Sequence, residues 1–492
     1  MYISTVGIAD IRFKDLILGF DSADYEATHH PDLLLRGFVD PRGLADVARS
    51  GKKFLFLGSK GSGKSALGEH LKLVAQRDPE LFVTFVNIDD VSFATFSQIL
   101  KGSMEPEARY PLVWSWLLLL FLLNSFSKDQ GSNFNQDDEL FLSVEALKQL
   151  GLLPEPSLKG AVHATSEKTF SVKLNTVIGG VEGAYKSTPG TGDLPFFVER
   201  LKLISGRFQS KSKHLLIIDG FDELLRRGHL QYDALGALIF EANRLNLSFA
   251  DAGNPAKIVV LCRTDLFERF PGPNKNKIRQ NSAVQLDWLD DPFQPKASSL
   301  VHLINHRASL SLGEAIDVFE TFLPPELKDY RDEGIRAELL AHTRRIPRDI
   351  VNLFAKLQEY SGDGRMSIGQ VFSGIAAYSR DYLLPEITDE MDNYVSGEHI
   401  ELSKKLFATV RKINPQLYEL REQCKVLGYP ESYDLMNALN VLFDCGAIGN
   451  ILTLRNGRSR SIFKYENRHA SFNQAQGVLI HRGLWRALNL NW

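Results

Sequence analysis

The sequence predicts an α/β protein built around a parallel β-sheet with helices on both faces, and three observations predict it. Five short apolar runs lie before residue 290, each too short for an ordinary helix. Longer segments of helical periodicity separate these runs, which is typical of alternating strands and helices. A glycine-rich loop directly follows the first run and opens a helix, the context in which parallel sheets bind phosphates.

The predicted strands share a continuous apolar pattern with polar or turn residues at both ends. They comprise residues 53–57, 82–88, 214–218, 257–261 and 283–286. Before them, residues 1–50 are expected to form a helical and irregular lead-in. Between the second and third strands, two short runs at 170–173 and 183–186 flank the Gly179–Gly180 pair, which predicts a β-hairpin insertion over about 157–193.

After residue 290 the predicted strands stop. Residues 291–395 show helical periodicity interrupted by Pro324, Pro325 and Pro347, which predicts a helical lid. The core of the parallel sheet is therefore expected to occupy residues 51–290.

The last domain is expected to comprise residues 396–492. Helices predicted at 401–412 and 435–443 precede an Asn456–Gly457 pair, which between alternating residues is a strong hairpin signal. A further strand is predicted at 477–481. Helices followed by such a hairpin predict a winged helix.

The loop after the first predicted strand has the P-loop pattern Gly-x-x-x-x-Gly-Lys-Ser. Its residues, with the first residue of the following helix, are Gly58, Ser59, Lys60, Gly61, Ser62, Gly63, Lys64, Ser65 and Ala66. Glycines let backbone N–H groups turn toward phosphates, and the helix N-terminus adds the positive end of its dipole. We expect Lys64 to reach the β- and γ-phosphates, Ser65 to ligate Mg²⁺, and the Lys60 side chain to point to solvent.

An acidic segment follows the third predicted strand. The apolar run ends in Asp219-Gly220-Phe221-Asp222-Glu223. Asp219 at the end of the strand is expected to hold Mg²⁺, and an acid further on to orient or deprotonate the attacking water. The sequence leaves open whether Asp222 or Glu223 is that base. Without the P-loop, the same residues would indicate only an acidic helix N-terminus.

Three arginines are further candidates, each with a plainer alternative. Arg263 ends the fourth predicted strand and is expected to sense the γ-phosphate, unless it is an ordinary surface arginine. Arg279 precedes the last strand, where it either enters the site of a neighbouring subunit or lies in a solvated loop. Arg348 begins a helix of the lid and either bridges lid and nucleotide or caps that helix.

These motifs together resemble those of STAND-type, AAA+-related P-loop ATPases. The likeness spans roughly residues 30–490, and its specific parts are the P-loop and the run 219–223, which is similar to a phosphate-site motif of NACHT-type members. A poorly characterised bacterial P-loop ATPase family also resembles the chain around 263–265. The resemblance implies a sheet of the additional-strand type, with the strand that carries the catalytic acid beside the P-loop strand.

The resemblance also implies hydrolysis of ATP with Mg²⁺ and a switch that works by oligomerisation, in bacteria often in antiphage defence. The chain carries no Asn-Lys-x-Asp pattern for reading guanine, since residues 274–277 break it, and no ABC-type signature. It has no recognisable effector domain or C-terminal repeat array, so a separate effector protein is expected. The alternative is a scaffold that holds nucleotide with negligible turnover and presents its C-terminal domain to DNA.

The C-terminal segment is basic in a chain whose formal net charge is -3. From residue 401 onward, thirteen Lys and Arg face seven Asp and Glu, which gives +6. Arg455, Arg458 and Arg460 surround the predicted hairpin, where they are candidates for binding DNA phosphates. Acidic residues flank the candidate recognition helix, so such binding is expected to be non-specific if it occurs.

Composition indicates a globular protein of the cytoplasm. Apolar residues make up 44% and charged residues 24% of the chain, and its three cysteines are scattered, which fits a reducing compartment. No secretory signal is visible at the N-terminus. The apolar segment 110–127 contains Pro111, Ser115 and Asn124, and is expected to be a buried core helix rather than a membrane span.

Overall fold

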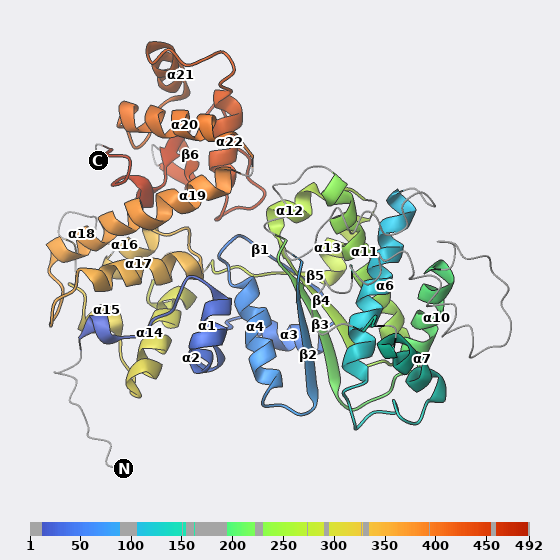
Figure 1. Ribbon diagram of the computed structural model, residues 1–492. Helices are drawn as coiled ribbons and strands as arrows, with labels where there is room; N and C mark the ends of the chain where they lie inside the picture. The colour runs from blue at the N-terminus through green and yellow to red at the C-terminus, as the bar shows by residue number, and fades with distance from the viewer. Residues whose placement is uncertain are drawn as a thin grey trace. The chain divides into compact units, whose positions relative to one another are not determined.

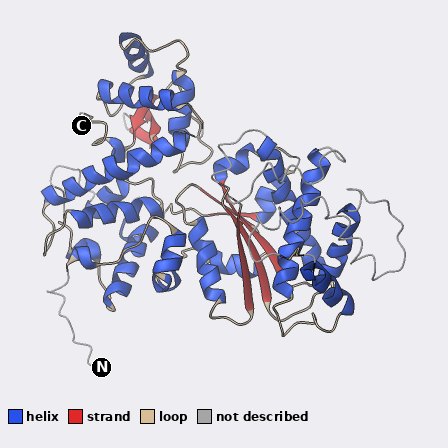
Figure 2. Ribbon diagram, in the orientation of Figure 1, coloured by secondary structure: helices blue, strands red, loops and turns tan. Residues whose placement is uncertain are grey.

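The computed structural model divides into two compact units, one formed by residues 27–286 and the other by residues 1–26 with 287–492 (Figures 1 and 2). The residues it describes are 12–88, 106–149, 151–153, 162, 194–221, 230–272, 274–289, 295–325, 327, 334–392, 394–453 and 459–490. The predicted hairpin insertion at 157–193 lies almost wholly outside these residues, as does the acidic pair Asp222 and Glu223.

A five-stranded parallel sheet forms the centre of the first unit, as predicted (Figure 2). The strands, in the order of the sequence, are β1 (Leu55–Gly58), β2 (Leu81–Asn87), β3 (Lys213–Asp219), β4 (Ala256–Arg263) and β5 (Ala283–Gln285). Each overlaps one of the five predicted runs. Parallel strands buried on both faces need nearly continuous apolar sequence, which is why these runs were recognisable.

The order of the strands differs from the expectation in one respect. Across the sheet they run β2-β3-β4-β1-β5, so β4 lies between the P-loop strand β1 and the acid strand β3. The prediction that the acid strand lies beside the P-loop strand is therefore wrong. Strand β4 pairs with both neighbours, with Leu55 opposite Val260 and Ile217 opposite Val259, so its backbone groups are bonded on both sides.

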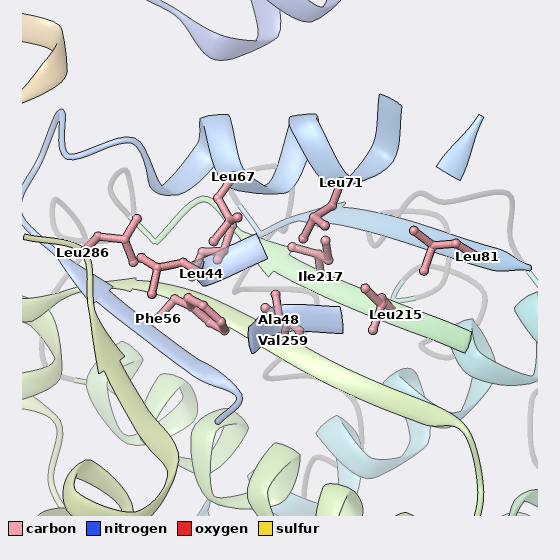
Figure 3. Close-up of a cluster of buried hydrophobic side chains, with 11 residues drawn as sticks. Leu44, Ala48, Phe56, Leu67, Leu71, Leu81, Leu215, Ile217, Val259 and Leu286 are labelled. Carbon is pink, nitrogen blue, oxygen red and sulfur yellow. The ribbon is translucent and has the colours of Figure 1, made fainter. Parts of the chain in front are cut away.

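Helices cover both faces of this sheet (Figure 1). On one face lie α2 (Pro31–Arg36), α3 (Leu44–Ser50) and α4 (Lys64–Ala75), and on the other α6 (Pro106–Phe126) and α11 (Leu230–Asp251), with α10 (Leu194–Gly206) and α7 (Asp138–Gln149) outside them. Figure 3 shows Leu67 and Leu71 of α4 packed with Ile217 of β3 and Phe56 of β1. This packing fixes the start of α4 relative to the end of β1.

Helix α6 accounts for the long apolar segment. Within the described residues it is the one helix long and apolar enough to span a membrane, and 78% of the window Arg109–Phe126 is buried inside the protein. It packs on β2, β3, α10 and α11. The apolar segment is thus a helix of the protein core, as predicted.

Helices of the second unit come from two parts of the chain. Residues 295–391 form η5 (Pro295–Ala297), α14 (Ser299–Leu312), α15 (Val318–Thr321), α16 (Gly334–Ala341), α17 (Pro347–Glu359), α18 (Ile368–Ala377), the π-helical η6 (Tyr378–Leu383) and α19 (Leu384–Met391). The N-terminal η2 (Phe13–Asp15) packs there too, since Phe13 stacks on Phe322 at 5.3 Å between ring centroids. Helix α1 (Ala23–His29) spans the division between the units, and its Glu26 forms a buried ion pair with Arg307 at 2.7 Å.

The C-terminal part of this unit contains three helices followed by a small antiparallel sheet. The helices are α20 (Gly397–Val410), α21 (Leu417–Val426) and α22 (Leu435–Asp444), and the strands are β6 (Ile448–Thr453), β7 (Ser459–Ile462) and β8 (Gly477–Ile480), before η7 (Arg482–Leu484). The sheet order is β7-β6-β8. Pairing of Thr453 with Ser459 confirms the predicted hairpin, whose turn lies outside the described residues.

Candidate nucleotide-binding site

The P-loop connects β1 to α4 at the carboxyl edge of the parallel sheet. All four residues of β1 are buried, and the chain then turns through Gly61 at φ 77° and Gly63 at φ 95° before α4 begins at Lys64. These left-handed conformations strain any residue with a Cβ, which explains both glycines. The loop therefore leads directly into a helix N-terminus, whose first N–H groups have no partner within the helix.

Gly58 is required for a different reason, namely space. An ideal Cβ at this position would lie 2.3 Å from Ser62 Oγ and 3.3 Å from Leu286 Cβ. The close approach keeps the loop tight over the end of β1. Gly68, one turn into α4, is equally constrained because a Cβ there would lie 2.4 Å from the ring of Phe85.

The Lys64 side chain lies within the loop. Its Nζ donates to the carbonyl oxygen of Ser59 at 2.9 Å and to that of Gly58 at 3.4 Å, and the residue is only 7% exposed. These two bonds hold the amine against the backbone of the loop. It therefore lies where a phosphate bound by the loop N–H groups could reach it.

Asp219 is the last residue of β3, at the same edge of the sheet. It is 8% exposed, and its carbonyl oxygen accepts a hydrogen bond from the N–H of Ile88 at 2.9 Å. Gly220 follows at φ 85°, and Phe221 is buried. This turn redirects the chain immediately after the carboxylate, and the two acids that follow in the sequence lie outside the described residues.

Arg263 lies at the end of the strand next to the P-loop strand. It ends β4 directly opposite Gly58 in the strand register, between the ends of β1 and β3. The residue is 4% exposed. Its guanidinium donates two hydrogen bonds to the Asp265 carboxylate, from Nε at 3.0 Å and from Nη2 at 2.7 Å. Such a bidentate pair fixes the orientation of the arginine at the N-terminus of α12 (Thr264–Arg269).

The other two arginine candidates have partners of their own. Arg279, on α13 (Lys275–Ser282), pairs with Glu268 and lies over the ring of Phe267 at 5.4 Å. Arg348 belongs to the second unit, at the start of α17, and its Nη1 lies 3.3 Å from Glu386 Oε1. Their roles at a nucleotide remain predictions.

Two polar strand ends were missed in the sequence. Asn87 ends β2 and stands opposite Asp219 in the register, and Gln285 ends β5 opposite Leu57. Thr264 Oγ1 lies 3.4 Å from Gln285 Oε1. The signal was present, because each apolar run is followed by a polar residue and parallel strands bring those ends together at one edge.

The donor set at this edge suits Mg²⁺. Among the described residues, no three or more His, Cys, Asp or Glu side chains are grouped so that they could hold a metal ion. Mg²⁺ in phosphate-binding proteins keeps several waters and takes only one or two protein oxygens besides phosphate. The Ser65 hydroxyl and the Asp219 carboxylate are ligands of that kind.

A second polar cluster lies at the opposite, amino edge of the sheet. His214 near the start of β3 is fully buried, its Nδ1 lies 2.8 Å from Ser125 Oγ, and its Nε2 lies 3.2 Å from Asp129 Oδ2. Phe82 stacks on the imidazole at 4.7 Å. Burial lowers the pKa of His214 to about 4 despite the carboxylate. Because His214 is fully buried and Ser125 and Asp129 are only 6% and 4% exposed, we interpret this Ser–His–Asp arrangement as structural rather than nucleophilic.

No protein-family model matches the chain, and a search of curated proteins finds no match either. The interpretation of this edge therefore depends on its own geometry and chemistry.

Proposed function

We propose that the chain is a Mg²⁺-dependent ATPase that acts as a molecular switch. The observation that carries this proposal is the shared edge of the sheet, where a glycine-constrained P-loop with an inward Lys64 lies beside Arg263 and one further strand from Asp219. Strands lie roughly 4.8 Å apart, so Asp219 is about 10 Å from the P-loop strand, a separation that phosphate, metal and water together fill.

The strand order supports a P-loop fold of the additional-strand type, with β4 as the strand inserted between the P-loop strand and the acid strand. We assign residues 396–492 to a winged helix, on the basis of α20, α21 and α22 followed by the β6–β7 hairpin. The STAND and AAA+ resemblance of the sequence agrees with both assignments.

In this mechanism the loop N–H groups and the start of α4 bind the phosphates. Lys64 exchanges its bonds to the Ser59 and Gly58 carbonyls for bonds to phosphate oxygens. Ser65 and Asp219 would hold Mg²⁺, and the bound ion would supply positive charge next to the phosphates. Asp222 or Glu223 orients the attacking water, and Arg263 responds to the γ-phosphate from its fixed position.

Further parts of the proposal concern the nucleotide, the compartment, the oligomeric state and the partners. ATP is favoured over GTP because the guanine-reading pattern is missing. We propose that the protein acts in the cytoplasm as a homo-oligomer, with Arg279 or Arg348 completing the site, and that it works with a separate effector protein, as in bacterial antiphage defence. DNA is a further candidate partner through Arg460, which is exposed on β7, and through Arg455 and Arg458, which lie outside the described residues.

The direct test is nucleotide binding by two loop variants, followed with a fluorescent ATP analogue and Mg²⁺. Lys64→Ala should weaken binding by about 100-fold, since it removes a charge-assisted bond to phosphate. Lys60→Ala, in the same loop, is the matched control and should bind nearly as wild type does. Equal binding by all three proteins would contradict the proposal. Tight binding with negligible phosphate release would favour the scaffold alternative.

A further inference from the structure

Helix α21 forms one wall of a surface groove in the C-terminal part of the second unit. The groove has a volume of about 350 Å³. Tyr418, Arg421 and Lys425 line it from the helix at i, i+3 and i+7 spacing, so they share one helical face. Tyr429 and Tyr433, from the turn between α21 and α22, line the other side.

Two of the three tyrosine rings are held rigidly. The Tyr429 hydroxyl donates to the carbonyl oxygen of Leu402 at 2.6 Å, and the Tyr433 hydroxyl lies 3.0 Å from Ser403 Oγ, both on α20. The two rings pack edge to face with centroids 5.1 Å apart. Burial raises the pKa of both hydroxyls to about 12, so neither ring carries a negative charge near neutral pH.

Tyr418, in contrast, is freely accessible. It is 66% exposed on a helix in which Leu420 is the residue that becomes fully buried. A large aromatic side chain left open beside rigid rings provides a flat stacking surface at low entropic cost.

The side chains that line the groove carry an excess of one positive charge. Arg421 and Lys425 face a single carboxylate in the lining, that of Glu422, which already lies 2.8 Å from Lys425 Nζ. In the part of the chain that the structure describes, Arg421 has no hydrogen bond or ion pair from its side chain. Two further acids, Glu431 and Asp434, are close in the sequence but are not part of the lining, and Asp434 caps α22 by accepting from the Asn437 N–H at 3.0 Å.

We propose that this groove binds single-stranded nucleic acid, with bases stacked on Tyr418 and Tyr429 and phosphates bound by Arg421 and Lys425. Aromatic rings interleaved with cations form the usual surface for single strands, whose unpaired bases can stack on protein. A volume of about 350 Å³ accepts one nucleotide, and the net charge of +6 from residue 401 onward attracts a polyanion. The proposal concerns a different surface from the hairpin arginines and does not depend on ATP hydrolysis.

The test is fluorescence anisotropy of a labelled oligothymidylate about 20 nucleotides long, long enough to cover a single-strand site. Tyr418→Ala should weaken binding by about 5- to 100-fold through loss of stacking. Tyr418→Phe, which keeps an aromatic ring, should bind the oligonucleotide nearly as tightly as wild type. Arg421→Ala should lower the slope of log affinity against log salt by about 0.7, as for one lost phosphate contact. Tyr360→Ala is the control, because Tyr360 is also exposed but lies elsewhere, at the end of α17.

Each outcome bears on the proposal. Wild-type affinity in Tyr418→Ala, with thermal unfolding unchanged, would overturn it, as would preference for a duplex of equal length over the single strand. Equal binding of a poly-glutamate peptide would show a site for acidic proteins instead. Lys64→Ala should bind the oligonucleotide normally without added nucleotide, so failure of the ATPase proposal would leave this result intact.

Discussion

Individual glycines of the P-loop have distinct physical roles. Gly61 and Gly63 supply positive φ, whereas Gly58 supplies space for Ser62. A sequence pattern presents all three as one motif, and only the backbone geometry separates conformational from steric requirements.

Replacing Gly58 by Ala should therefore destabilise the protein and weaken nucleotide binding together. The added Cβ would lie 2.3 Å from Ser62 Oγ, and overpacking of this kind costs about 1–3 kcal/mol. Chemical denaturation of Gly58→Ala measures the change in free energy of unfolding. Gly364→Ala is the control, because nothing lies within 4 Å of its Cβ and its φ is not strained. Ser62→Gly added to Gly58→Ala should recover part of the loss, and no recovery would count against the steric explanation.

Arg344 of the second unit has three partners on different elements. Buried at 5% exposure, it binds Asp349 at 3.0 Å, Glu390 at 2.7 Å and the carbonyl oxygen of Cys445 at 3.4 Å. One residue thus joins the start of α17, the end of α19 and the end of α22. The two carboxylates hold the pKa of Arg344 well above its usual value against the effect of burial.

Arg344→Met should consequently lower the free energy of unfolding by about 3–5 kcal/mol, because Asp349 and Glu390 would be left buried without their cation. Lys404→Ala provides the comparison, since its surface pair with Glu401 should be worth about 0.5 kcal/mol or less. Denaturant unfolding of the two variants measures both costs. Similar small losses in both would mean that the Arg344 cluster does not stabilise the unit.

At the scale of elements, the strands and most helices were predictable from local patterns. The five strands are continuous apolar runs, and α17 begins at Pro347, the position that proline favours. The order of the strands was not predictable, because pairing of β4 between β1 and β3 depends on partners far apart in the chain. Helix α21 was missed because most of its residues are polar and only Leu420 is buried, so it offers few apolar positions from which to recognise a helix.

The cluster of His214, Ser125 and Asp129 illustrates the same limit. In the sequence, His214 is 85 residues from Asp129 and 89 residues from Ser125, and no motif relates positions at such separations. They connect the start of β3 to the end of α6 and the loop beyond it, at the edge of the sheet opposite the P-loop. Polar groups packed in this way determine which loop covers which strand.

This cluster predicts a loss of stability in mild acid. His214 has a folded pKa of about 4, below the unfolded value near 6.5, so the unfolded chain binds the proton first. Its contribution is complete above pH 6.5 and is lost as the pH falls toward 4, by up to about 3 kcal/mol. Urea unfolding between pH 7 and pH 4 should show this slope, and His214→Gln should reduce it. An equal slope in the variant would assign the effect to other groups, such as the buried His481 and His342, whose pKa values are also lowered.

At the scale of the whole molecule, the candidate site is only partly contained in the described residues. The P-loop, Asp219 and Arg263 belong to the first unit, whereas Arg348 belongs to the second. The sequence predicted the phosphate loop because its spacing is a local requirement of backbone geometry. It could not determine where each arginine lies, since that depends on the partners Asp265, Glu268 and Glu386.

The central claim is catalysis, and steady-state phosphate release over a series of protein concentrations tests it most directly. With ATP and Mg²⁺, turnover per molecule should rise as the protein concentration rises. Lys60→Ala should turn over at a rate close to wild type, and Lys64→Ala should lose turnover. Asp222→Asn and Glu223→Gln, measured separately, should identify the base. It is the residue whose substitution leaves ATP binding intact but slows phosphate release by about 100-fold. Phosphate release by Lys64→Ala at the wild-type rate, or none by wild type at any concentration, would contradict the account.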